Sequence, residues 1–148
     1  MTNENINRWP QIQFLIFCVD RCNGGLMDQV FEFVMTNGGI CSYSNYTYTA
    51  VQGNTCLAKK CEPVAKITGY KDIEAGNEKQ LMLALNRQPI SVAIEADEPG
   101  FQFYAEGVMN AECGEQLDHG VLLVGYGTDI INGTSTDYWK IKNSWFVT

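Results

Sequence analysis

The chain has 148 residues, of which 45% are apolar and 18% charged, values typical of one globular domain and not of a disordered segment. Seventeen Asp and Glu residues outnumber ten Lys and Arg, and the formal charge of −7 argues against a nucleic-acid partner, which requires a basic patch. No apolar run reaches the roughly 18 residues of a membrane-spanning helix.

The first predicted element is a short apolar helix from Leu26 to Thr36. Val30, Phe33 and Val34 recur at the spacing of one helix face. Asn37-Gly38-Gly39 predicts the helix end, because glycine tolerates the left-handed backbone that closes a helix. We expect this helix to be buried on most of its sides.

The rest of the chain reads as turns, strands and a second helix. Residues 40–62 are turn-like, and Asn77 is the expected N-cap of a helix over Glu78–Asn86. A polar loop is expected between the last two strands. The fold class predicted is therefore α+β, with mostly antiparallel strands after residue 63. Four segments are expected to be strands: Val64–Tyr70, Ile90–Glu95, Gly120–Tyr126 and Tyr138–Lys142.

Cysteine usage indicates an oxidising compartment. The chain has six cysteines, no CxxC pair and one histidine, so disulfides are favoured over a structural zinc site. Two N-glycosylation triplets, Asn45-Tyr46-Thr47 and Asn132-Gly133-Thr134, agree with this assignment, although such triplets are common by chance. The cysteines are Cys18, Cys22, Cys41, Cys56, Cys61 and Cys113.

His119 and Asn143 are the residues that suggest chemistry. A lone histidine is more often a core or surface residue, and an asparagine after a strand is often only a turn former. Together they suggest acyl transfer, because a histidine that acts as base and acid needs a third group to hold its ring. An amide oxygen suffices when the nucleophile is a thiolate, since the thiolate–imidazolium pair is already ionic. A nearby tryptophan would shield that hydrogen bond from water.

Eight short motifs follow one another along the chain between Cys22 and Trp145. In this order they resemble the papain family of cysteine peptidases, closest to its cathepsin L-like branch, and the resemblance covers residues 18–145. The motifs are Cys22-Asn23-Gly24-Gly25-Leu26-Met27-Asp28, Asn37-Gly38-Gly39-Ile40, Tyr46-Thr47-Tyr48, Pro89-Ile90-Ser91-Val92-Ala93-Ile94, Phe101-Gln102-Phe103-Tyr104, Leu117-Asp118-His119-Gly120-Val121, Gly125-Tyr126-Gly127 and Tyr138-Trp139-Lys140-Ile141-Lys142-Asn143-Ser144-Trp145.

The resemblance implies an incomplete papain-like fold, with one helix of the helical lobe and most of the antiparallel β-barrel lobe. Residues 1–17 are then an unmatched segment, and residues 18–148 form a partial peptidase domain. Val30, Phe31 and Val34 are expected to be exposed where the family's long helix would cover them.

The resemblance also implies roles for individual residues. His119 is the catalytic base and acid, Asn143 orients it, and Trp145 covers their contact. No cofactor and no metal ion are expected. For Met27 and Ala93 ordinary packing is the alternative interpretation. The residues expected to bind an extended peptide, through backbone bonds or as a pocket for its second residue, are Gly24, Gly25, Met27, Ala93, Leu117, Asp118 and Gly120.

The sequence departs from the family at its nucleophile. The family's catalytic cysteine precedes its histidine by about 130–150 residues, in a Cys-Gly-Ser-Cys-Trp-type segment. Counted back from His119, that position falls before residue 1, and the oxyanion-hole glutamine is expected to be missing as well. We therefore expect a truncated cysteine-type endopeptidase that is inactive alone. The alternative is a non-catalytic pseudopeptidase, a decoy that binds cystatin-type inhibitors or propeptides.

The family pattern also bears on the cysteines and on location. Cys22 and Cys113 would lack their family partners, and a Cys18–Cys56 disulfide remains possible. Cys41 and Cys61 are not general to the family, and we expect them to pair with each other. The resemblance implies an extracellular, lysosomal or vacuolar protein that acts on peptides, although residues 1–17 lack the features of a signal peptide.

Overall fold

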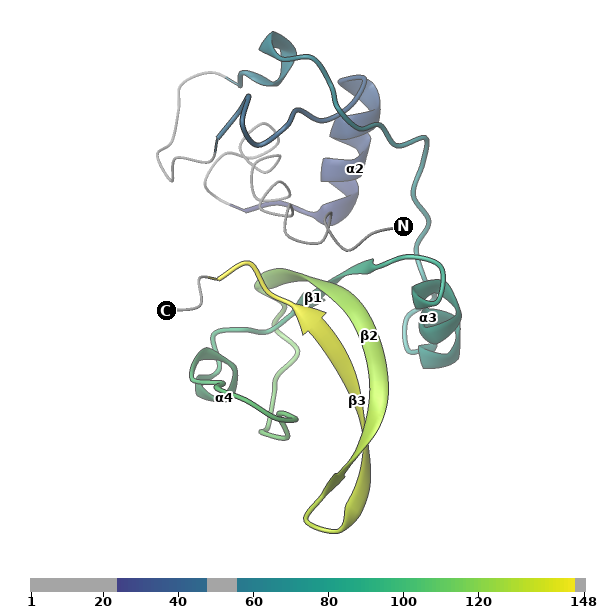
Figure 1. Ribbon diagram of the computed structural model, residues 1–148, viewed down its shortest axis with the longest axis vertical. Helices are drawn as coiled ribbons and strands as arrows, with labels where there is room; N and C mark the ends of the chain where they lie inside the picture. The colour runs from purple at the N-terminus through teal and green to yellow at the C-terminus, as the bar shows by residue number, and fades with distance from the viewer. Residues whose placement is uncertain (1–23, 48–55, 146–148) are drawn as a thin grey trace. The chain divides into compact units, whose positions relative to one another are not determined.

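A computed structural model of the chain describes residues 24–47 and 56–145. Its internal contacts divide the chain into two compact units, the first ending at Asp72 and the second beginning at Ile73 (Figure 1). The mixed helical and antiparallel content confirms the expected α+β class. The first unit contains α2 (Met27–Thr36) and the 3-10 turn η3 (Ala58–Lys60); the second contains α3 (Glu78–Leu85), β1 (Ile90–Ile94), α4 (Pro99–Gln102), β2 (His119–Ile131) and β3 (Thr134–Lys142).

Helix α2 ends as its sequence predicts. Gly38 takes a positive φ of 80°, and its N–H donates to the carbonyl of Met35 at 3.2 Å. The Gly39 N–H donates to the carbonyl of Val34 at 2.9 Å. These two bonds form a Schellman motif, which satisfies carbonyls that the last helical turn leaves without partners.

The core of the first unit lies on one face of α2. Val30 and Val34 are only 4% and 5% exposed, so the expected exposure of this face is wrong. Within the unit, four partly buried side chains pack against the two valines, one from α2 itself and three from the chain that follows the helix. These side chains are Phe33, Ile40, Tyr46 and Ile67.

A second contact fixes the segment before Asp72 to the other side of α2. The Tyr70 ring lies 5.7 Å from the Phe31 ring, and its hydroxyl donates to a Glu32 carboxylate oxygen at 3.0 Å. That hydrogen bond, with a smaller contribution from desolvation and nearby acidic charges, raises the pKa of the Tyr70 phenol.

The strand predicted over Val64–Tyr70 is wrong. The segment forms only an isolated antiparallel bridge, in which the Ile40 N–H donates to Ala65 and the Val64 N–H donates to Ile40. The chain beyond Ile40 turns at once, through Cys41 and the turn that follows it, so the Val64–Tyr70 segment has no longer partner with which to pair.

Gly39 is packed against this bridge, and its replacement is expected to be costly. Its φ is 135°, and an added Cβ would lie 2.5 Å from the Ala65 carbonyl oxygen and 2.6 Å from the Pro63 Cβ. Gly39→Ala should therefore lower the free energy of unfolding by about 2–4 kcal/mol, from backbone strain and overpacking together.

Gly38→Ala is the matched control for this prediction. Gly38 also has a positive φ, but an added Cβ would meet no atom within 4 Å. Gly38→Ala should therefore lower the free energy of unfolding by only about 1–2 kcal/mol, the cost of placing alanine in a left-handed backbone conformation. Urea unfolding of both variants measures the difference, and equal losses would show that the close approach to Ala65 carries no cost.

The second unit is built on a three-stranded antiparallel sheet in the order β1-β2-β3. Strand β1 pairs with the start of β2, from Ile94 opposite His119 to Ile90 opposite Leu123. Strand β3 pairs with β2 from Leu122 to Ile131, with a register shift between Leu123 and Gly125 that is typical of a β-bulge. In Figure 1, β2 and β3 therefore run on as a curved two-stranded ribbon beyond the end of β1.

The polar loop expected between the last two strands is wrong. Residues 127–131 and 134–137 continue β2 and β3, and a two-residue turn of Asn132 and Gly133 joins them. Both turn residues have positive φ, 51° and 79°, as a type I′ hairpin requires. Asn-Gly is the strongest short hairpin signal, and the polar Asp, Thr and Ser residues around it obscured that signal in the sequence.

The two helices of the second unit each start with a residue that is common at helix N-termini. The Asn77 side chain accepts a hydrogen bond from the Gln80 N–H at 3.0 Å, which confirms the predicted N-cap of α3. At the other end of this helix, Asn86 accepts a bond from the Tyr126 hydroxyl of β2 at 3.1 Å. The short helix α4, which we did not predict, starts with Pro99 in its first turn.

Candidate active site

The ends of two neighbouring strands bring His119 and Asn143 together. His119 is the first residue of β2, and Asn143 follows the last residue of β3. Because the strands are antiparallel neighbours, these two termini meet at the same end of the sheet. The His119 Nε2 lies 2.8 Å from the Asn143 Oδ1, in a half-buried position.

The same asparagine oxygen defines which ring nitrogen carries the proton. The Ser144 backbone N–H donates to Asn143 Oδ1 at 2.8 Å, and a backbone amide can only donate. The atom facing both Ser144 and His119 is therefore an acceptor, so Nε2 must donate to it. In the neutral ring this leaves Nδ1 with its lone pair available as a base.

An aromatic side chain covers the imidazole. The Trp145 ring stacks on the His119 ring, with centroids 5.1 Å apart and planes 29° apart. Phe101 of α4 meets Trp145 edge-on, with centroids 5.4 Å apart. The sequence indicated the tryptophan, but it did not indicate that Phe101 supports it, because the two residues are far apart along the chain.

Asp118 holds the start of β2 against the end of β1. Its Oδ1 accepts a hydrogen bond from the Ala96 N–H at 2.7 Å, and its own N–H donates to the Ile94 carbonyl at 3.0 Å. Since His119 is the next residue, these bonds fix the backbone that carries the imidazole. The expected contact of Asp118 with a substrate stays a prediction.

The predicted pocket residues fall into both units. In the second unit Ala93 and Gly120 are cross-strand partners, an added Cβ at Gly120 would meet nothing within 4 Å, and Leu117 is 64% exposed. Gly24, with φ of 91°, belongs to the first unit. The other first-unit residues of the predicted set are Gly25 and Met27.

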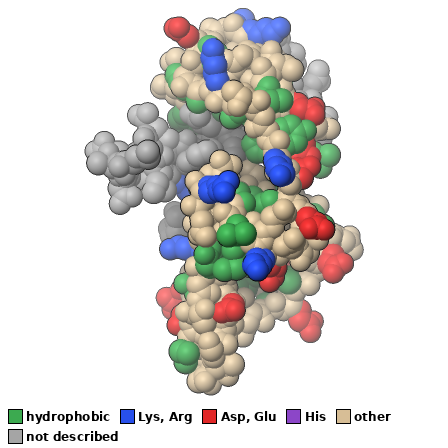
Figure 2. Space-filling model, turned by 90° about the vertical axis from the view of Figure 1, so that its right-hand side faces the viewer, with side chains coloured by type: hydrophobic (Ala, Val, Ile, Leu, Met, Phe, Trp, Pro, Cys, Tyr) green, Lys and Arg blue, Asp and Glu red, His purple; other side chains and the backbone are tan. Residues whose placement is uncertain are grey.

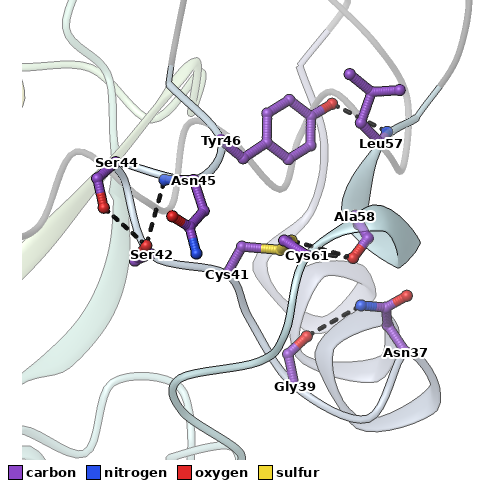
Figure 3. Close-up of a disulfide and its surroundings, with 10 residues drawn as sticks. All are labelled: Asn37, Gly39, Cys41, Ser42, Ser44, Asn45, Tyr46, Leu57, Ala58 and Cys61. Carbon is purple, nitrogen blue, oxygen red and sulfur yellow. Dashed lines mark hydrogen bonds between the residues drawn. A yellow bond between two sulfur atoms is a disulfide. The ribbon is translucent and has the colours of Figure 1, made fainter.

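A disulfide joins Cys41 and Cys61, as expected, with their Cα atoms 5.9 Å apart (Figure 3). Cys41 is 3% exposed, and the Ala58 carbonyl lies near both sulfur atoms. Cys56 is also disulfide-bonded; Cys18, its expected partner, and Cys22 lie outside the described residues. Cys113 is a free, exposed thiol.

Charged side chains form one further group in the second unit. Carboxylate oxygens of Glu95, Asp97 and Glu98 lie within 4.8 Å of one another, and Glu95 already accepts a bond from the Gln116 N–H at 2.7 Å.

On the face that Figure 2 shows, basic side chains lie among acidic ones. The helices that the structure describes are all too short or too polar to cross a bilayer.

Sequence comparisons place the chain among peptidases. A family model described as "Papain family cysteine protease" matches residues 11–148, and so extends into the segment 1–17. Vignain from Ricinus communis is 48% identical over 124 residues, which are 84% of this chain and 34% of that protein. Cysteine endopeptidase RepA from Oryza sativa subsp. japonica is 50% identical over 124 residues, 84% of this chain and 32% of that protein. The chain thus spans about a third of the length of these relatives.

Solved structures give the same result for the fold. The bromelain protease from Ananas comosus, in complex with the E64 inhibitor, superposes with a TM-score of 0.79 at 40% identity, covering 90% of this chain and 60% of that one. The Amb a 11 cysteine protease, a ragweed pollen allergen, in its proform has a TM-score of 0.80 at 37% identity, covering 90% and 36%.

Proposed function

The chain belongs to the papain family of cysteine proteases, and on that premise we propose that it forms part of a cysteine endopeptidase in which His119 is the catalytic base and acid. The observation that carries this proposal is the 2.8 Å contact between His119 Nε2 and Asn143 Oδ1. Asn143 acts as the positioning residue, because it holds the proton on Nε2 and leaves Nδ1 to exchange protons with the reacting groups.

The proposed reaction passes through an acyl-enzyme. His119 Nδ1 takes the proton of a cysteine thiol, and the thiolate attacks the peptide carbonyl to form a tetrahedral intermediate. As the C–N bond breaks, Nδ1 returns the proton to the leaving amine. His119 then removes a proton from water, which attacks the thioester and releases the acid. Throughout, the Asn143 bond and the Trp145 ring keep the imidazole in one orientation.

We further propose that these 148 residues do not hydrolyse peptides by themselves. They contain no Cys-Gly-Ser-Cys-Trp-type segment. Acyl transfer therefore needs a nucleophile segment and its oxyanion donors in addition to the residues present, because neither His119 nor Asn143 can replace them.

The proposal is tested by completing the chain. A fluorogenic dipeptide with a bulky hydrophobic second residue is assayed at mildly acidic pH, with the 148-residue chain alone and with the chain joined to the N-terminal mature segment of Ricinus vignain. We expect turnover only from the joined protein, and its complete block by a thiol-directed epoxide. A folded joined protein without turnover, which binds a cystatin-type inhibitor, would instead favour the decoy.

Leu117 is proposed to line the pocket for the second substrate residue, since its side chain is exposed and it lies three residues before Gly120, the cross-strand partner of Ala93. Leu117→Glu in the joined protein should raise the preference for Arg over Leu at that position about 10-fold or more, through attraction to the new carboxylate. Leu117→Gln, equal in size but uncharged, is the control. An unchanged preference, or the same change in both variants, would remove Leu117 from the pocket.

Partners and location follow from the same proposal. We propose peptide or protein substrates, a propeptide as in the Amb a 11 proform, and inhibitors of the cystatin type. The Cys41–Cys61 disulfide supports an extracellular, lysosomal or vacuolar location. Proteolysis as proposed uses only side chains and water, without a cofactor.

A further inference from the structure

The tip of the β2–β3 hairpin carries an Asn-x-Thr triplet that the proposed peptidase chemistry does not use. Asn132 and Gly133 form the turn, and Thr134 begins β3. All three residues are exposed. His119 lies at the opposite end of β2, so the triplet is remote from the candidate active site (Figure 1).

The geometry of the turn makes the asparagine amide accessible. Asparagine is one of the few residues that adopt a left-handed backbone readily, and Asn132 does so with a φ of 51°. Among the described residues, none forms a hydrogen bond with the Asn132 side chain. Its Nδ2 is therefore open to a modifying enzyme, and a large substituent there would displace no packed side chain.

The second triplet, Asn45-Tyr46-Thr47, also has an exposed asparagine, but its other two residues have partners in the fold. Tyr46 packs against the buried core of the first unit, and its hydroxyl accepts a bond from the Leu57 N–H at 3.2 Å (Figure 3). The Thr47 hydroxyl donates to the Tyr43 carbonyl at 3.1 Å. Two residues of this triplet therefore contact the rest of the first unit, whereas all three residues at the hairpin tip are exposed.

We propose that Asn132 is a site of N-linked glycosylation. Its Nδ2 attacks C1 of an oligosaccharide carried on a polyprenyl diphosphate; the C1–N bond forms as the C1–O bond breaks, the polyprenyl diphosphate leaves, and the amide gives up one proton. The inference rests on the oxidising, secretory location within the proposed function. A glycan at this position would also shield Ile130, which is 67% exposed on the same ribbon.

The test uses the 148-residue chain, secreted from a eukaryotic host behind a cleavable signal. Peptide N-glycosidase in heavy-oxygen water converts a glycosylated asparagine into labelled aspartate, which peptide mapping locates. We expect the label at position 132 in the parent and in Thr134→Ser, which keeps the acceptor triplet. We expect no label there in Thr134→Ala, which loses the triplet but keeps the Asn132-Gly133 turn.

The proposal is overturned if Asn132 of the secreted parent carries no more label than in a digest without the glycosidase, which measures spontaneous Asn-Gly deamidation, or if such excess label persists in Thr134→Ala. The same peptide map reports the Cys41–Cys61 disulfide, so only folded protein is scored. Because the host signal imposes secretion and no turnover is measured, a negative result would reject the glycosylation site and leave the peptidase proposal standing.

Discussion

His119→Ala is expected to lower kcat/KM of the joined, nucleophile-bearing protein by a factor on the order of 10⁵, since removal of the base in a catalytic triad removes almost the whole rate enhancement. The free energy of unfolding should change little, because the ring is half-buried at one end of the sheet and outside the buried core. Steady-state kinetics and urea unfolding of the same preparations measure the two quantities.

Asn143→Ala provides the graded comparison for this prediction. It keeps the imidazole but removes the oxygen that holds Nε2–H, so we expect a loss in kcat on the order of 10²–10³ together with an altered pH profile. A substitution that only damaged the fold would not alter the pH profile. Turnover that survives in His119→Ala would overturn the assignment of the base.

Removal of the Cys41–Cys61 disulfide should lower the free energy of unfolding substantially. The bond closes a loop with a sequence separation of 20, for which chain-entropy arguments give about 3 kcal/mol. The double variant Cys41→Ala, Cys61→Ala should lose that amount, and the alanines avoid burying a hydroxyl at the nearly inaccessible Cys41 site.

Urea unfolding of the oxidised proteins measures this loss, with Cys113→Ala as the control. Cys113 is exposed and free, so its replacement should change the free energy of unfolding by no more than about 0.5 kcal/mol. A double variant as stable as the parent would mean that the cross-link does not constrain the unfolded chain.

The local sequence predicted those elements that carry their own signals. The glycines after α2 and the Asn77 cap define helix ends through backbone and side-chain chemistry that needs no distant partner. The order of the short motifs likewise predicted which histidine, asparagine and tryptophan would meet. For the helix ends the information lies within a few neighbouring residues, whereas the motif order depends on the family resemblance over residues 18–145.

Features that depend on a distant partner could not be predicted in the same way. The Val64–Tyr70 segment was predicted as a strand, but whether it becomes one depends on how far Ile40 and the residues after it run alongside. The burial of Val30 and Val34 depends on Ile67, and the support of Trp145 depends on Phe101. The far half of the β2–β3 hairpin depends on cross-strand pairing of polar residues. Their composition alone predicts a loop.

We propose that the chain holds one imidazole in the orientation of a peptidase base. His119 is the only histidine among the 148 residues, so long-range ¹H–¹⁵N correlation spectra of the neutral ring report on it without assignment. We expect a single tautomer with the proton on Nε2 and a bare Nδ1, and loss of this preference in Asn143→Ala. A proton on Nδ1, or rapid averaging between the two tautomers, would contradict it.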